Sequence, residues 1–347
     1  MTDRATPSTI VDVARAAGVS VATVSRALRG LDRVSPSTRE RVRRVAYELN
    51  YLASPTATSL ASGQTRIIGV IVPFASRWYF ASMVAAIGKA LRERGYQVLL
   101  FDLEQEPFGG RHELTRSMLW KRVDGVVSIS IAMTQDELDL LTGLHVPVVS
   151  IGFDLAGRPS VRIDDYQAAR TAIEHILDLG HVDVAFIGVE PPSSQLNATP
   201  QERLAAFRDA LDARDLPIRE DWVLATDWTA DDARRLTHEI LSASGPRPTA
   251  VMCASDEIAF GVHMAAREFG LRLPADLSIV GIDDHNLASL FGLTTVRQDF
   301  AAQGEQSAVL LLDAIAQQQA PPGGPRRVLV DTEFVRRSST APPPPAR

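Results

Sequence analysis

The chain has 347 residues, 45% of them hydrophobic and 22% charged, and a formal net charge of −6. These values are typical of a soluble globular protein, and the length predicts two or three compact units rather than one core. No apolar run reaches membrane-spanning length and the first residues lack the apolar core of a signal peptide, so we expect a cytoplasmic protein without a membrane partner. The single cysteine, Cys253, lies in an apolar run and is interpreted as a small buried hydrophobe, so no metal or cofactor is expected.

The charge is distributed unevenly along the chain. Residues 1–66 contain 10 arginines and 5 acidic residues, a net charge of +5, which leaves −11 for the remainder. A basic N-terminal unit attached to an acidic body is typical of a DNA-binding head on a separate sensor domain.

The first predicted elements lie between Thr9 and Arg29, where the pattern indicates two short helices joined by a tight turn. Thr9 can cap the first helix, and Asp12 can reach back to complete a capping box. Gly18 can end this helix, because glycine adopts the left-handed conformation without a Cβ penalty.

The second of these helices can be capped by Ser20, and its two sides differ. The expected buried side is Val21 or Ala22, with Val24 and Leu28. The expected exposed side is Thr23, Ser25, Arg26 and Arg29. This arrangement predicts a helix-turn-helix whose second helix enters a DNA major groove, and a helical hairpin with a basic surface is the alternative.

A third helix is predicted to begin at Ser35-Pro36 and to reach about Leu49. Its arginines could contact phosphates or form a solvated face. Residues 54–65 then predict a short hinge helix that Ser54 can cap and Gly63 can end. Two turns are not stable alone, so such a helix could form on DNA and insert Leu60 between base steps of the minor groove. A plain linker is the alternative.

From residue 67 onward, apolar strands alternate with helical patterns, which predicts parallel sheets covered by helices on both faces. Because the strands are too many for one small sheet, we expect an α/β body of two lobes, with a ligand cleft at the carboxyl ends of the strands. The expected strands are 67–72, 96–101, 126–129, 146–151, 184–187, 222–225, 250–254 and 278–282. The expected helices are 80–94, 111–121, 165–179, 201–213, 231–243 and 258–269.

The sequence contains no Gly-x-Ser-x-Gly, His-Glu-x-x-His, Walker or Cys-x-x-Cys motif, which favours a sensor over an enzyme. The N-terminal motif Thr9–Arg26, with Val34-Ser35 and Leu49-Asn50-Tyr51, closely resembles the head of lactose-repressor-type (LacI/GalR) regulators. The resemblance continues through Glu202–Phe207, Ser255–Gly261 and Ser278–Asp284 and covers nearly the whole chain.

The resemblance implies a helix-turn-helix DNA-binding domain (1–53), a hinge helix and linker (54–65), a two-lobed effector-binding and dimerisation domain (66–340) and a disordered proline-rich tail (341–347). The implied function is a ligand-controlled, sequence-specific transcriptional regulator that binds a palindromic operator as a homodimer. Its effector would be a small molecule, with a sugar preferred. The implied DNA-binding residues are Thr9, Ser20, Val21, Ala22, Thr23, Ser25, Arg26, Arg29, Ala57 and Leu60. The implied effector-binding residues are Phe80, Arg203, Trp228, Ser255 and Asp283.

For the effector residues, the chemistry fits a polyhydroxy ligand. Asp283 could accept hydrogen bonds from vicinal hydroxyls, Arg203 could donate in a fork, and Trp228 could offer a flat face to a sugar ring. Read without the resemblance, Arg203 could be a surface arginine near Asp209 or Glu202, Trp228 could be a core residue, and Asp283 and Ser255 could be caps.

Three departures from the family pattern bear on function. Val21 and Ala22 open the second helix where the lactose repressor has bulky polar residues, and Arg77-Trp78 stands where many members have Asn-Pro. The tail has no leucine heptads, which favours a dimer over a coiled-coil tetramer. Other functions remain open: a corepressor-dependent regulator of the purine type, because a purine would also stack, and a two-lobed solute-binding protein of a transporter.

Overall fold

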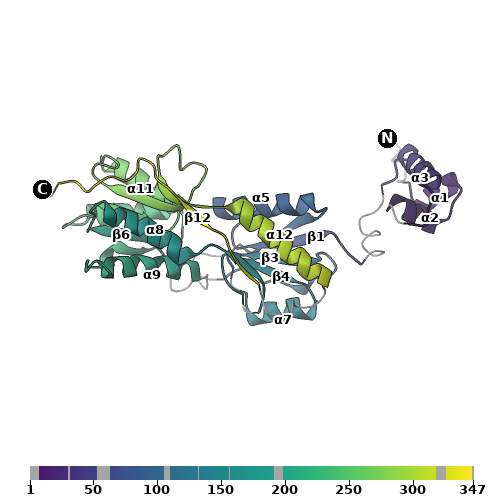
Figure 1. Cartoon of the computed structure of the whole chain (residues 1–347), viewed down its shortest axis with the longest axis horizontal. Helices are drawn as coiled ribbons and strands as arrows, with labels where there is room; N and C mark the ends of the chain where they lie inside the picture. Colours follow the sequence, from purple (N-terminus) through teal and green to yellow (C-terminus); the bar gives the residue numbers. More distant parts are fainter. Residues whose placement is uncertain are drawn as a thin grey trace, which may run out of the picture. The chain divides into compact units, whose positions relative to one another are not determined.

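The computed structural model of the chain divides it into two compact units, Met1–Thr65 and Arg66–Arg347. Figure 1 shows the helices and strands of each unit. The structure describes residues 8–29, 32–52, 63–104, 110–131, 133–155, 157–190, 198–317 and 326–345. The predicted hinge residues Ala57 and Leu60 lie outside these ranges.

Three helices form the described part of the first unit, and side chains fix where each begins. They are α1 (Ile10–Ala17), α2 (Val21–Leu28) and α3 (Pro36–Glu48). The Thr9–Asp12 capping box is present, and Gly18 ends α1 in the left-handed conformation with φ 65°. Ser20 caps α2 and Ser35 caps α3, each hydroxyl accepting a backbone N–H. The predicted helix boundaries of the head are therefore confirmed by their capping contacts.

The head is held together by small apolar side chains, but one part of its predicted core is wrong. Val21 and Ala22 are both exposed, whereas Val24 and Ala27 are fully buried. Val24 and Ala27 are three residues apart and share one face of α2, while Val21 and Ala22 lie on the turn that precedes this contact. The buried core of this unit is Val13, Ala14, Ala17, Val24, Ala27, Val42, Val45 and Ala46.

The second unit contains two six-stranded sheets, as the number of predicted strands implied. The first sheet is entirely parallel, in the order β11-β5-β4-β3-β1-β2. Its strands are β1 (Ile67–Val72), β2 (Gln97–Asp102), β3 (Gly125–Ile129), β4 (Val148–Ile151), β5 (Ser160–Arg162) and β11 (Arg327–Leu329). Helices α5 (Trp78–Glu93) and α12 (Phe300–Gln317) pack against each other and cover one face (Figure 1). The other face packs near α6 (Arg116–Leu119) and α7 (Gln135–Gly143).

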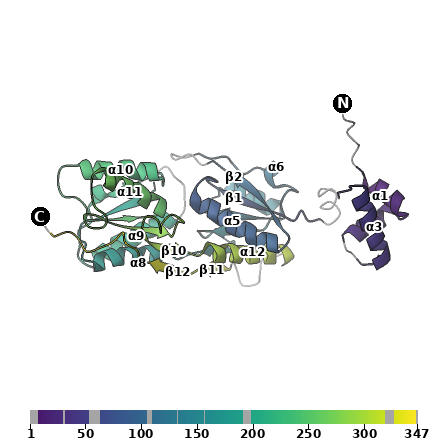
Figure 2. The ribbon, with the colours of Figure 1, turned by 90° about the horizontal axis from the view of Figure 1, so that it is seen from above.

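The second sheet has the order β12-β10-β9-β8-β6-β7, with only β12 antiparallel to its neighbour. Its strands are β6 (Val184–Val189), β7 (Val223–Ala225), β8 (Ala250–Cys253), β9 (Ser278–Asp283), β10 (Thr294–Gln298) and β12 (Thr332–Val335). A short 3₁₀ helix, η1 (Glu220–Trp222), precedes β7. Helices α8 (Asp165–Asp178) and α9 (Ala198–Asp212) form one packed pair, and α10 (Ala230–Ser242) and α11 (Asp256–Glu268) form another. Figure 2 shows the two pairs on opposite sides of this sheet.

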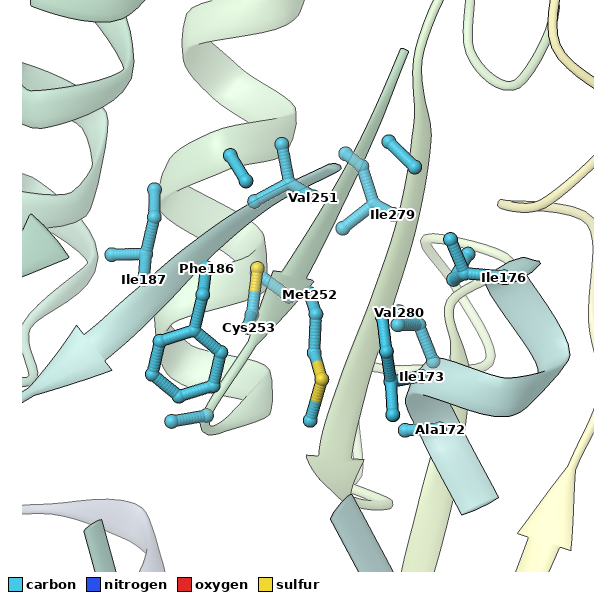
Figure 3. Close-up of a cluster of buried hydrophobic side chains, with 14 of the residues drawn as sticks. Ala172, Ile173, Ile176, Phe186, Ile187, Val251, Met252, Cys253, Ile279 and Val280 are labelled. Atoms are coloured by element: carbon cyan, nitrogen blue, oxygen red, sulfur yellow. The ribbon is translucent and has the colours of Figure 1, made fainter. Parts of the chain in front are cut away.

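The first sheet and its helices form the first lobe of this unit, and the second sheet and its helices form the second lobe. Apolar side chains from neighbouring parallel strands build the core of the second lobe. Figure 3 shows Phe186, Met252 and Val280, from β6, β8 and β9, beside Ile173 and Ile176 of α8. Cys253 is also fully buried there, as its apolar context predicted, and burial raises the pKa of its thiol. Near-continuous apolar strands of this kind are expected where helices cover both faces.

The chain passes between the two lobes three times: after β5, between β10 and α12, and between β11 and β12. Each of these crossings spans only a few residues. None of the helices in the described ranges is long and apolar enough to span a bilayer.

Two further sequence expectations differ from the structure. The helix expected over 111–121 is reduced to α6, because the preceding backbone bonds elsewhere: His112 N–H donates to Leu103 O, and Leu114 N–H donates to Glu137 Oε1. The tail was expected to be disordered from residue 341, yet Ala341 N–H donates to Ser278 Oγ at 3.0 Å and its carbonyl accepts from His181 at 2.8 Å. These bonds fix Ala341 against β9.

Close packing of α10 on α11 makes Gly261 a test of the second lobe. A Cβ added there would lie 2.1 Å from the backbone oxygen of Ala230. Because backbone must move, we predict that Gly261→Ala lowers the free energy of unfolding by about 1–3 kcal/mol. The matched control is Gly143→Ala in α7, where nothing lies within 4 Å and stability should stay level or rise slightly. Equal urea midpoints for the two variants would contradict the packing of α10 on α11.

Candidate functional site

The exposed side of α2 carries the residues predicted to read DNA. Arg26 is exposed, and its side chain makes no hydrogen bond or ion pair with any described residue, whereas Arg29 Nε donates to the Ser25 carbonyl at 3.2 Å. Thr9 and Ser20 are also exposed, and their hydroxyls serve as helix caps. The remaining predicted residues are exposed (Val21, Ala22) or half-buried (Thr23, Ser25). The surface therefore offers one unpaired guanidinium beside small side chains.

In the second unit, polar side chains gather where strands of both sheets end. Asp283 ends β9 and Ala254 follows β8 in the second lobe, while Ser130 follows β3 in the first. Tyr79, near the start of α5, brings its hydroxyl to 3.5 Å from Ser130 Oγ. Asp283 has φ 127° and Ser130 has φ 43°, values that are costly for residues with a side chain. Carboxyl ends of parallel strands are the usual position of ligand sites in such sheets.

Arg203 is at the centre of this cluster and is buried. Its Nε and Nη2 donate to Asp165 Oδ1 at 2.9 and 2.7 Å, and Nη1 donates to the Ala254 carbonyl. Burial disfavours its charge, but the carboxylates of Asp165 and Asp283 hold the pKa of Arg203 above its ordinary value. The reading of Arg203 as a surface residue is wrong. Three of its five N–H groups are used, and the other two have no partner among the described residues.

Asp283 is buried beside this ion pair. Burial raises the pKa of Asp283 to about 7, against the opposing charge of Arg203 and a hydrogen bond from Gln298. Gln298 Nε2 donates to Oδ1 at 2.7 Å, and Oδ2 has no partner within the described part of the chain. At neutral pH the carboxyl group of Asp283 is therefore close to its titration midpoint, and its Oδ2 can accept a hydrogen bond from another donor.

The other three predicted effector residues, Trp228, Phe80 and Ser255, have different contacts from those of Arg203 and Asp283. Trp228, with φ 67°, is half-buried against the core of the second lobe, yet its buried Nε1–H finds no hydrogen-bond partner in the described ranges. Phe80 packs on the core of the first lobe, with its ring centroid 5.1 Å from that of Tyr79. Ser255 caps α11 by accepting the N–H of Ile258, so its capping reading is confirmed.

Sequence reasoning missed several residues that complete the cluster. Two acidic residues stand at the start of α8: Asp164 caps the helix, and Asp165 binds Arg203. The second acidic residue, which capping does not need, was the available signal. Thr199 Oγ1 donates both to Asp165 Oδ2 and to the carbonyl of Gly152, each at 3.2 Å, and so joins the two lobes.

Gln298 connects the cluster to an interlobe crossing. A polar cavity of about 430 Å³ follows two of the crossings, and Gln298 contributes to its wall while its amide holds Asp283. The cavity is lined by Arg297, Gln298, Asp299, Phe300, Asp331, Thr332 and Glu333. Within the described ranges, no group of three or more His, Cys, Asp or Glu side chains is placed to hold a metal ion.

Comparison with known protein families matches both units. Residues 9–54 match the family described as bacterial regulatory proteins, lacI family, and residues 173–340 match the periplasmic binding protein-like domain. The first match covers the helix-turn-helix, and the second covers the lobe that supplies Arg203 and Asp283.

Individual relatives match over nearly the whole chain. The HTH-type transcriptional repressor PurR of Actinobacillus pleuropneumoniae is 32% identical, over 89% of this chain and 91% of its own. The structure of the lac repressor dimer bound to operator and the anti-inducer ONPF is 29% identical, with a TM-score of 0.82 over 97% of this chain and 100% of its own. The complex of the transcriptional regulator CelR with cellobiose is 30% identical, with a TM-score of 0.68 over 96% of this chain and 99% of its own. The chain therefore belongs to the lacI family of bacterial regulatory proteins and is a DNA-binding transcriptional regulator controlled by a ligand.

Proposed function

We propose that the chain acts as a dimeric repressor of a carbohydrate-utilisation operon and that a sugar induces release of its operator. One observation carries the sugar assignment: a buried cluster offers both donors and an acceptor without partners in the described ranges. These are two N–H groups of Arg203 and Oδ2 of Asp283, and the indole N–H of Trp228 is a further buried donor of the same lobe without a partner in those ranges. Vicinal hydroxyls of a sugar both donate and accept, so a polyhydroxy ligand satisfies the whole set.

The relatives support the same assignment without deciding it. CelR is seen with cellobiose, and the lac repressor is seen as a dimer with operator and the anti-inducer ONPF. A two-fold dimer suits a palindromic operator, because each head can read one half-site. The basic head argues against a solute-binding protein of a transporter, because that function does not require a DNA-binding unit.

In this proposal Arg26 reads a base and the neighbouring side chains fix the position of the helix. The proposed DNA contacts are Thr9, Ser20, Val21, Ala22, Thr23, Ser25, Arg26 and Arg29, with Ala57 and Leu60 of the hinge. The proposed effector contacts are Arg203, Asp283 and Trp228, with Phe80 and Ser255 bordering them. Ligand and DNA then alter each other's affinity by the same factor, because both bind one lobe arrangement better than another.

The assignment of α2 is tested by Arg26→Ala. A guanidinium paired bidentately with guanine contributes about 1–3 kcal/mol of discrimination, so operator preference should fall by about 5- to 150-fold. Weak, salt-sensitive binding to any duplex should persist. Competition gel shifts with operator and random duplex measure this loss. Arg15→Ala is the control, because Arg15 is an equally exposed arginine of α1 paired with Asp12 at 3.3 Å; a loss of preference as large as that of Arg26→Ala would contradict the role of α2.

The effector class is tested by thermal-shift screening against sugars and nucleobases, since a ligand that binds the folded form raises the melting temperature. We expect a sugar to give the shift and Asp283→Asn to abolish it, because an amide replaces the accepting oxygen with a donor. The variant should still bind operator. Asp284→Asn is the matched control, since the neighbouring Asp284 pairs with Arg297 and Arg337 instead. A shift with purines alone would replace the sugar by a corepressor.

Sugar affinity should also depend on pH, because only the ionised Asp283 is a pure acceptor. With a pKa of about 7, the ionised fraction rises about tenfold between pH 6 and pH 8, and calorimetric affinity should rise with it. The stability of the ligand-free fold should change with pH in the opposite direction. The folded-state pKa lies above the unfolded value, so ligand-free stability should fall as pH rises from about 4 to about 7. Sugar affinity that stays level across this range would contradict the contact with Asp283.

A further inference from the structure

The two lobes touch through a pair of stacked rings beside the ligand cluster. Trp78, the first residue of α5 in the first lobe, has its ring centroid 4.2 Å from that of His285, with 36° between the ring planes. His285 follows β9 of the second lobe and is buried, at 8% exposure. Other contacts between the lobes near the cluster are polar: the Thr199 hydroxyl donates to the Gly152 carbonyl, Arg162 forms an ion pair with Glu202, and the backbone N–H of Trp78 donates to Glu257 of α11.

Both rings are held in place by their own lobes. The backbone N–H of His285 donates to Asp256 Oδ2 at 2.8 Å, and the ring Nδ1 of His285 accepts the backbone N–H of Leu287 at 3.0 Å. Phe260 packs edge-on against the imidazole at 5.0 Å. On the other side, Phe300 lies edge-on to Trp78 at 5.3 Å and 88°. Each ring thus has contacts within its own lobe, and the geometry of the ring pair depends on how the lobes are placed.

The stack is continuous with the ligand cluster. Trp78 immediately precedes Tyr79, whose hydroxyl lies near Ser130 and within electrostatic reach of Arg203 and Asp283. His285 comes two residues after Asp283 on the same chain. A movement of one lobe that separates the rings therefore also separates Tyr79 from Arg203 and Asp283.

We propose that the stack of Trp78 on His285 is an interlobe latch, which holds the lobes in the arrangement that binds the effector. Trp78 and His285 are positioning residues for effector binding. Only the experiment that measures sugar binding rests on the proposed function. Offset aromatic contacts depend steeply on ring placement, so a rotation between lobes breaks the latch. Loss of either ring moves the equilibrium toward a more open arrangement and lowers effector affinity by the population lost.

The first test measures lobe separation without any ligand. Nitroxide labels are placed at Lys89→Cys in the first lobe and Asp212→Cys in the second, both exposed, while the native Cys253 is buried. Labelled chains are diluted with unlabelled ones, and distances are measured by pulsed electron resonance. Trp78→Ala and His285→Ala should each add a population at longer distance, and Trp78→Phe should restore much of the parent distribution.

The control for this measurement is His238→Ala. It removes the ring that packs on Phe269 at 4.9 Å, a histidine–aromatic contact of the same kind but within one lobe. Its distance distribution should match the parent. Identical distributions for the parent, Trp78→Ala and His285→Ala would overturn the latch.

The second test is a calorimetric titration with cellobiose. An aromatic pair contributes about 0.5–1.5 kcal/mol, so each single alanine variant should bind about two- to twelvefold more weakly. The double variant should bind no more weakly than the weaker single one, because one contact is lost in all three. Effects that multiply would overturn the latch. If the parent itself binds no sugar, the proposed effector class fails, and the label distances still decide whether the latch exists.

Discussion

The ion pair between Arg203 and Asp165 is the interaction on which the proposed ligand site depends. Both side chains are almost fully buried, and the guanidinium also donates to the Ala254 carbonyl, so one charge pair ties α9, α8 and the end of β8 together. Breaking a buried pair by removing one partner leaves an uncompensated charge and costs about 3–5 kcal/mol. Such a pair is retained more for geometry than for stability. The ion pair of Arg203 with Asp165 holds two further N–H donors of Arg203 beside Asp283. The Thr199 hydroxyl links the Asp165 carboxylate to the carbonyl of Gly152 in the first lobe.

The surplus of carboxyl groups around this pair gives the site its electrostatic character. Burial raises the pKa of Asp256, Glu257 and Asp283, against the opposing charges of Arg77 beside Glu257 and of Arg203 beside Asp283. Asp256 has its oxygens occupied by Thr295 and the N–H of His285, so its role is to fix the loop after β9. Asp283 differs, since Gln298 takes only one of its oxygens. A neutral hydroxyl that donates to the other oxygen stabilises the ionised form, whereas an anionic ligand would meet like charge.

Local signals in the sequence predicted the head and eight of the twelve described strands, because capping boxes, glycine turns and apolar runs act over a few residues, whereas β5, β10, β11 and β12 were missed. Thr9, Gly18 and Ser20 have the expected contacts. The failures involve residues whose hydrogen bonds are made at long range. The expected helix over 111–121 loses its first turn to bonds with Leu103 and Glu137, and the tail is fixed by Ser278 and His181. In the site, Arg203 and Asp283 were found through the resemblance, but Asp165 and Gln298 were missed, since only the tertiary fold brings them together.

Gln298 supplies a physical reason why a ligand at Asp283 can act beyond its own lobe. It ends β10, just before the chain crosses to α12, and its side-chain Oε1 accepts from Gln303 Nε2 at 3.2 Å. A continuous set of buried hydrogen bonds thus runs from the ligand-facing carboxylate through the crossing into α12. Helix α12 packs on α5 and on the sheet that begins with β1, the first strand after the head. In the proposed function, a ligand that changes the bond of Asp283 to Gln298 therefore acts on a crossing between the lobes, and linkage requires DNA binding to act back on the ligand by the same free energy.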